Sequence, residues 1–274
     1  MKNDFKVYWQ GDPIARLVPG RDYLSPDISL IIDEMIEYEN QKKLFDFLSK
    51  WLNKKIYDDL ESLFKLKFIK ENNSQVRALA FHLYENNGVV KRDTVKKIVD
   101  QIDQNQRKVL RDLGVKFGRY HIFMYKLFKP GAVSLRILLW KNFSQKLLKF
   151  EPPTFGLNFL EDKHKTNQKL MLLCGFEKFD NFYVRIDILE RLFIHIIKLG
   201  DKNNKDIKLS PEMLNLLGCN KSNFVKLIKL MNYKTTEKNN EIYFKYFPKK
   251  LLNKNKDKAE KDNAFSVLSQ LIIK

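Results

Sequence analysis

Cationic and aromatic side chains are interleaved in the middle of the chain, between residues 104 and 150. This stretch contains eleven Lys or Arg residues and a single acid, Asp112. Phosphates bind where several cations share one surface, and unstacked bases pack on flat side chains. We therefore expect a nucleic-acid-binding surface in this stretch, with the candidate residues Arg107, Arg111, Lys116, Arg119, Tyr120, His121, Lys126 and Lys129.

The same residues have a simpler structural explanation. In that case the aromatic rings pack in a core and the lysines form a solvated face of the protein. We favour the core for most of the rings and the phosphate-facing surface for the excess of charge. Arg119, beside Tyr120 and His121, is the residue to test first.

The sequence contains no recognisable motif for catalysis or cofactor binding. It has no Gly-x-x-x-x-Gly-Lys-Ser/Thr loop for nucleotide phosphates, no Gly-x-Gly-x-x-Gly and no Gly-x-Ser-x-Gly. The four histidines are far apart and the two cysteines form no pair with metal-ligand spacing. We therefore expect no catalytic residue, no metal and no cofactor in this chain, with a hydrolase of an unrecognised type as an alternative.

The overall charge also favours a polyanionic partner. The chain has 51 basic and 33 acidic residues, and its formal net charge is +18. Most of the bases are lysines, and the sequence is also rich in Asn, which is typical of an AT-rich genome and accounts for part of the excess. We expect RNA or DNA as the partner rather than an anionic membrane. Without a signal-like or membrane-spanning run, the expected location is the cytoplasm.

Apolar spacing in the first 150 residues predicts a helical bundle behind a short hairpin. Residues 5–18 alternate like a hairpin, which Pro19-Gly20 ends. Apolar residues then recur every three or four positions at about 40–65, 75–87 and 94–113, so we expect three helices. A partly extended stretch and a further helix beginning at Pro130 complete this half.

The second half is expected to form a smaller α+β unit. Residues 151–166 resemble a loop and mark a soft domain boundary. We expect a winged-helix-like domain at 167–247, because residues 188–247 have the order helix, short helix, Gly-containing turn, helix and hairpin. On the helix expected at 221–232, the candidate contacts Ser222, Lys226 and Lys229 lie opposite the apolar face. A Lys-rich linker (248–263) and a short helix (264–274) would follow.

The predicted fold class is therefore mainly α: a helical bundle with an N-terminal β-hairpin, followed by the winged-helix-like domain. Asp187 and Glu190 have the spacing of a capping box at the start of a helix in this second unit. Arg185 and Arg191 flank them and are candidates to pair with these acids.

Four segments resemble one protein family. Residues 11–18 read GDPIARLV, 113–123 read LGVKFGRYHIF, 184–192 read VRIDILERL and 216–219 read LLGC. In this order they resemble the region after the motor in bacterial MgpS-type superfamily-two helicases, which are related to the mitochondrial suppressor-of-var RNA helicase. The resemblance covers nearly the whole chain. The segments at 113–123 and 184–192 are its most specific parts.

The resemblance implies two RecA-like motor domains that hold ATP and Mg²⁺, encoded before this region or on a separate chain. None of their motifs occurs in this sequence, so the expected role is a non-catalytic accessory region that grips single-stranded or unwinding RNA or DNA. The alternative is a protein-interaction scaffold that docks a helicase core or a ribonuclease. The sequence does not choose between RNA and DNA.

Overall fold

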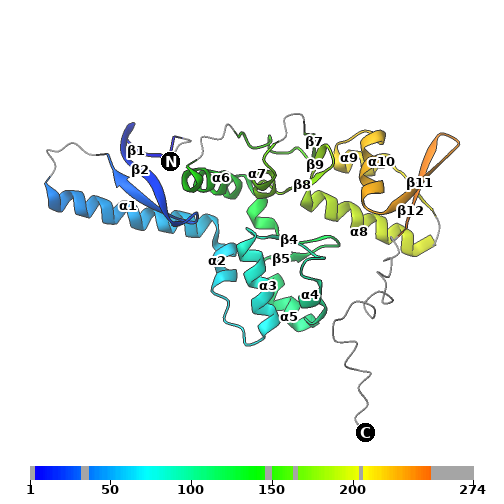
Figure 1. The fold of residues 1–274 in the computed structure, drawn as a ribbon, viewed down its shortest axis with the longest axis horizontal. Coiled ribbons are helices and arrows are strands. Elements are labelled where there is room, and N and C mark those ends of the chain that lie inside the picture. The colour runs from blue at the N-terminus through cyan, green and yellow to red at the C-terminus, as the bar shows by residue number, and fades with distance from the viewer. Residues whose placement is uncertain (1–3, 32–36, 146–149, 163–165, 204–205, 248–274) are drawn as a thin grey trace, which may run out of the picture.

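The computed structural model describes residues 4–31, 37–145, 150–162, 166–203 and 206–247. The expected linker (248–263) and C-terminal helix (264–274) lie outside these residues, as do Lys146 and Lys149. Figure 1 shows an elongated molecule, with the first sheet and α1 at one end and the hairpin β11–β12 at the other.

The fold is α+β, and the expectation of a mainly α protein is wrong. About 49% of the chain is helical and 25% is strand, and the described residues form four three-stranded antiparallel sheets. Several of these strands have only three or four residues. Strands this short give little periodic signal in the sequence, because the partners that stabilise them lie far away along the chain.

The N-terminal hairpin is part of a three-stranded sheet. Strands β1 (Lys6–Trp9), β2 (Asp12–Asp22) and β3 (Ser25–Leu30) pair in sequence order. Pro19-Gly20 does not end the unit as predicted, since it lies within β2 where the register with β3 shifts. The sheet packs against α1 (Tyr38–Asp59) and α6 (Pro130–Ser144).

Two of the long helices predicted in the first half are each broken into two. The helix expected at 40–65 divides at Leu60 into α1 and α2 (Glu61–Lys67). The one expected at 94–113 divides into α4 (Lys96–Asp100) and α5 (Gln104–Asp112), because Asp103 and Gln106 form a capping box that starts a new helix. The helix α3 (Ser74–Glu85) was predicted correctly.

A small sheet lies between the two halves of the molecule. Its order is β4 (Val89–Lys91), β6 (His121–Met124) and β5 (Val115–Phe117). Ile122 and Met124 enter the N-terminal core. Phe123 instead packs with Val89 and Phe128 of the first half and with Ile186 of the second half. A 3-10 helix, η1 (Tyr125–Phe128), links β6 to α6.

The expected loop at 151–166 includes strand β7 (Phe159–Glu161), which pairs with β9 (Phe182–Arg185). The sheet has the order β7, β9, β8 (Phe176–Phe179), and α7 (Gln168–Leu173) precedes it. Val133 and Ile137 of α6 share a core with α7 and this sheet. Apolar packing is therefore continuous across the expected boundary.

The last unit contains α8 (Ile186–Asn203), β10 (Ile207–Lys208), α9 (Pro211–Leu217), α10 (Lys221–Leu230), β11 (Tyr233–Lys238) and β12 (Glu241–Tyr246). Its sheet has the order β10, β12, β11. Two helices separated by the left-handed Gly218, then a hairpin, is the element order that the sequence predicted. Phe224, Leu227 and Ile228 of α10 are fully buried in its core.

One arginine of the basic segment lies in the interior rather than on the surface. Arg136 of α6 is 0% exposed and donates hydrogen bonds to the backbone carbonyls of Asn87, Leu127 and Leu173. Burial lowers its pKa to about 10, so the guanidinium is still charged at neutral pH. Arg136 therefore ties α7 to the first half of the chain.

We expect Arg136→Met to lower the free energy of unfolding by about 3 kcal/mol, because three buried carbonyls lose their charged donor. Urea titration followed by circular dichroism measures this change. Arg111→Met, at an exposed position of α5, is the matched control and should shift the free energy by less than about 0.5 kcal/mol. Equal effects of the two substitutions would contradict a structural role for Arg136.

Candidate nucleic-acid interface

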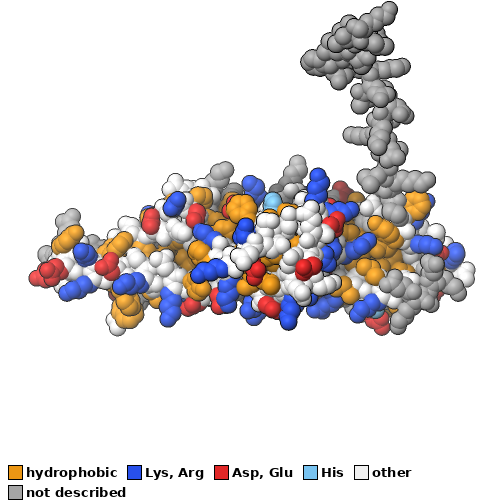
Figure 2. Space-filling view, turned by 90° about the horizontal axis from the view of Figure 1, so that it is seen from below, with side chains coloured by type: hydrophobic (Ala, Val, Ile, Leu, Met, Phe, Trp, Pro, Cys, Tyr) orange, Lys and Arg blue, Asp and Glu red, His pale blue; other side chains and the backbone are white. Residues whose placement is uncertain are grey.

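The residues predicted from the basic segment fall on α5, β5, the β5–β6 loop, β6, η1 and the start of α6. Arg107 and Arg111 are on α5, Lys116 is on β5, and Lys126 and Lys129 are at η1 and the start of α6. Figure 2 shows Lys and Arg side chains spread along one face of the molecule, with acidic and hydrophobic side chains between them. The face shown in Figure 2 therefore carries no continuous strip of cations.

The two arginines of α5 use their donors locally. One terminal nitrogen of Arg107 donates to the carbonyl of Val99 at 3.0 Å, and Arg107 is half-buried. Arg111 is exposed and donates to the side-chain oxygen of Gln104 at 3.2 Å. Arg107 is therefore partly withdrawn from solvent, and Arg111 is the more accessible of the two.

The loop between β5 and β6 is held by a buried carboxylate. Glu190 of α8, 3% exposed, accepts hydrogen bonds from the backbone amides of Arg119, Tyr120 and His121. Its Oε1 also lies 3.1 Å from Nδ1 of His121. Gly118 completes this site, because a Cβ there would overlap the Glu190 carboxyl group. Glu190 is thus a bridge between the two most specific segments of the sequence, and not the second half of a capping box.

A second carboxylate faces the other side of the same imidazole. Glu177 of β8 lies 3.6 Å from Nε2 of His121 and 2.6 Å from Nζ of Lys91. Burial alone would lower the pKa of His121, but its contacts with Glu177 and Glu190 raise it above the usual value. Burial would raise the pKa of Glu177, and hydrogen bonds to His121 and Lys91 lower it instead. His121 is 3% exposed, so its predicted place in a nucleic-acid surface is wrong.

Tyr120 contributes to the core rather than to a stacking surface. Its ring packs edge-on against Phe193 of α8, with 4.7 Å between the ring centroids. It is half-buried beside the core of the last unit. The alternative of core packing therefore describes Tyr120 better than base stacking does.

The Arg119 side chain points to the hairpin of the second half. Its guanidinium carbon lies 5.9 Å from the centroid of the Tyr246 ring on β12. At the same end of the hairpin, Lys234 of β11 lies 3.7 Å from the centroid of Phe247. Tyr246 and Phe247 are 42% and 53% exposed, respectively. Two pairs of a cation and an accessible aromatic ring therefore lie at the open end of the hairpin, one on each of its faces. We call Arg119, Lys234, Tyr246 and Phe247 the hairpin patch.

The predicted contacts on α10 lie on its outer face. Ser222, Lys226 and Lys229 are on the side of the helix turned away from its buried face. The helix packs on the hairpin through Phe224, whose ring is 5.7 Å from that of Phe244. The apolar back and cationic front that the sequence predicted for this helix are confirmed.

Glu190 and Tyr246 were not predicted to belong to this region. Glu190 had a detectable signal: it is the charged residue on the stripe formed by Ile186, Leu189 and Phe193, at helical spacing. A carboxylate on a buried stripe needs hydrogen-bond donors, so this position predicts a contact with donors from another part of the chain. Tyr246 gave no such signal, because an aromatic residue at the end of a strand is common. Arg185 pairs with Asp187 at 2.7 Å, which is one of the pairings predicted for the flanking arginines.

The described residues also bear on membrane insertion and metal binding. Within the described residues, no helix is both long and apolar enough to cross a bilayer. Over the same ranges, no group of three or more His, Cys, Asp or Glu side chains is placed to hold a metal ion. Comparisons with protein-family models, curated proteins and solved structures found no match.

We expect Glu190→Gln to destabilise the protein by about 2 kcal/mol, because a neutral amide replaces charge-assisted bonds to three buried amides and brings its own NH₂ donor among them. Glu212→Gln, at an exposed position of α9, is the matched control with little expected effect. Urea titration of both variants measures the difference. A variant at position 190 as stable as the control would show that this bridge contributes nothing.

The same cluster predicts a pH dependence with a defined window. The raised pKa of His121 means that its contribution is complete below its usual value of 6.5 and is lost as the pH rises through the folded-state pKa. The lowered pKa of Glu177 means that its contribution is present above 4.5 and is lost as the pH falls. The difference in unfolding free energy between the native chain and Glu177→Gln should therefore be largest between these values.

Urea titrations from pH 4 to 9 measure this difference, and the same measurement with Glu161→Gln, an exposed acid on β7, provides the control. A difference between the native chain and Glu177→Gln that stays constant from pH 5 to 9 would exclude a charged His121 as the partner of Glu177.

Proposed function

We propose that this chain binds single-stranded or unwinding nucleic acid through the hairpin patch and the cationic face of α10. In this role it is a non-catalytic accessory region of, or partner to, an ATP-driven RNA or DNA helicase. The motor pulls the strand, and this region holds it by contacts to phosphates and bases.

One observation carries the proposal. The basic stretch around Arg119 contacts the hairpin that follows the predicted helix-turn-helix, at Arg119 and Tyr246. The sequence singled out these two segments for different reasons, the first for its charge and the second for its order of elements. Among the described residues, neither Arg119 nor Lys234 forms an ion pair with a carboxylate. Cations without acidic partners are available to phosphates, and exposed rings beside them are available to bases.

The backbone at the patch supports the same role. Glu190 and Arg92 fix the loop that carries Arg119: Arg92 donates from its side chain to the carbonyl of Gly118 at 2.8 Å, and its own amide donates to the carbonyl of Tyr120 at 2.7 Å. A cation on a rigid loop loses less conformational entropy on binding than one on a mobile loop. The helicase partner rests on the resemblance of the segments at 113–123 and 184–192.

A second candidate function is a protein-interaction scaffold. The observation that favours it is a set of exposed aromatic side chains on α1: Tyr38, Phe45, Phe47 and Tyr57. Aromatic side chains are enriched at protein–protein interfaces. A scaffold would hold helicase motor domains after nuclease treatment and show no direct affinity for oligonucleotides.

The test of nucleic-acid binding is fluorescence anisotropy with a labelled single-stranded oligonucleotide at several salt concentrations. We expect an affinity that falls steeply with salt. In the double variant Arg119→Glu, Lys234→Glu the slope of log K against log salt should become less negative by about 0.7 for each phosphate that the variant no longer neutralises. The affinity itself should fall for every sequence tested.

The matched control is Arg111→Glu with Lys108→Glu on α5, which makes the same change in charge away from the hairpin patch. It should retain most of the affinity. Equal losses in the two double variants would mean that only net charge matters, and no binding at low ionic strength would refute the proposal.

A further inference from the structure

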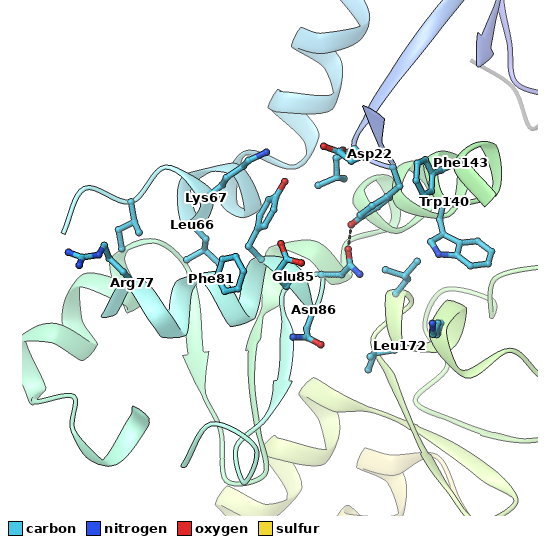
Figure 3. Close-up of a pocket in the computed structure, with 17 residues that line it drawn as sticks. Asp22, Leu66, Lys67, Arg77, Phe81, Glu85, Asn86, Trp140, Phe143 and Leu172 are labelled. Carbon is cyan, nitrogen blue, oxygen red and sulfur yellow. Dashed lines mark hydrogen bonds between the residues drawn. The ribbon is translucent and has the colours of Figure 1, made fainter. Parts of the chain in front are cut away.

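A groove with an aromatic lining lies apart from the hairpin patch, between the β2–β3 turn, α2, α3 and α6. Its volume is about 940 Å³, at the upper end of the range for ligand sites. Figure 3 shows Phe81 and Glu85 of α3 on one side and Trp140 and Phe143 of α6 on the other, with Asp22 and Lys67 near the top. Nothing in the proposed function uses this groove.

The lining is suited to flat ligands. Five aromatic side chains from three separate parts of the chain border the groove: Tyr23, Phe81, Tyr84, Trp140 and Phe143. Phe81 and Phe143 are 61% and 44% exposed, so their rings are open to a ligand rather than used in the core. The groove is also too large for a single base, so it has room for more than one.

The rim carries cations close to these rings. The Nζ of Lys67 lies 5.1 Å from the centroid of Tyr84. Arg77 and Lys169 also border the groove, and Arg77 donates to the backbone carbonyls of Glu71 and Asn72. Within the described part of the chain, neither Lys67 nor Lys169 forms an ion pair with a carboxylate. A ring beside an available cation is the arrangement that receives a base together with its phosphate.

The two acids of the groove add selectivity. Glu85 is exposed on the α3 side, and Asp22 lies at the opposite turn, where it accepts a hydrogen bond from the amide of Leu24. A carboxylate repels phosphate but accepts hydrogen bonds from the amino group of a base such as cytosine. Thymine and uracil carry no such group.

We propose that this groove binds unstacked bases of a single nucleic-acid strand and prefers bases that carry an exocyclic amino group. The inference rests on the proposed function, because the same strand would contact the hairpin patch. The bases stack on Phe81 and Phe143, the phosphates contact Lys67, and Glu85 accepts from the amino groups.

The experiment uses the 274-residue chain and oligonucleotides of equal length, oligo(dC) and oligo(dT), at low salt. We expect oligo(dC) to bind more tightly, and Phe81→Ala with Phe143→Ala to weaken its binding roughly fivefold or more. Both rings are exposed, so these substitutions leave the core intact. Phe47→Ala, at a ring on α1 that is 62% exposed, is the matched control and should leave the affinity unchanged.

Photo-crosslinking with an oligonucleotide that contains 5-iodocytosine locates the contact. We expect adducts on peptides of α3 and α6. These adducts should be lost in the double alanine variant. In addition, Glu85→Ala should narrow the ratio of oligo(dC) to oligo(dT) affinity.

The outcomes separate this inference from the proposed function. Binding with adducts on β12 alone, and unchanged affinity in the groove variants, would overturn the groove and keep the hairpin patch. In that case the groove would bind a different ligand, such as a polypeptide segment. An affinity ratio that Glu85→Ala does not change would overturn the base preference. No binding of either oligonucleotide would overturn both proposals.

Discussion

The buried carboxylate of Glu190 is the constraint on which the arrangement of the two halves depends. A carboxylate this deep is stable only when its oxygens accept hydrogen bonds, and here three consecutive backbone amides and an imidazole supply them. All of these donors come from the loop and strand at 119–121, about 70 residues earlier in the chain. The bond network therefore fixes the loop against α8. Because α8 belongs to the same core as β11 and β12, it also sets where Arg119 stands relative to the hairpin.

Local features of this fold were predictable from the sequence, and distant pairings were not. The helix α3, the left-handed Gly218 and the two faces of α10 depend on neighbours within a few positions, so the spacing of residue types predicts them. The break at Leu60 was missed because apolar spacing continues across it. The short strands β4 and β7 were missed because their partners are distant, and this omission led to the wrong fold class.

A count of charges along the sequence does not predict which cations reach the surface. The excess of cations between residues 104 and 150 is large, but a count does not show direction. Arg136 points inward to three carbonyls, and Arg107 turns to Val99. His121 is enclosed by carboxylates. Only the folded chain separates cations that satisfy the protein's own acceptors from those, such as Arg119, that stay accessible. For α10 the spacing of apolar residues was sufficient, because it identifies the buried face of the helix and therefore also the opposite, exposed face.

The groove and the hairpin patch are connected by rigid structure, and this connection matters for how a flexible strand would bind. At the edge of the groove, the carbonyl of Asn87 accepts a hydrogen bond from Arg136, and β4 begins two residues later. That strand pairs with β6 and ends next to Arg92, which clamps the Arg119 loop. The two surfaces are thus held at a fixed separation by a paired strand and buried hydrogen bonds. Two weak contacts held at a fixed spacing bind a strand that spans both more tightly than either contact alone, since the second contact forms at a high effective concentration. If the chain binds a strand as proposed, a modest affinity at each surface would be sufficient for a firm grip, and such a grip could still be released stepwise.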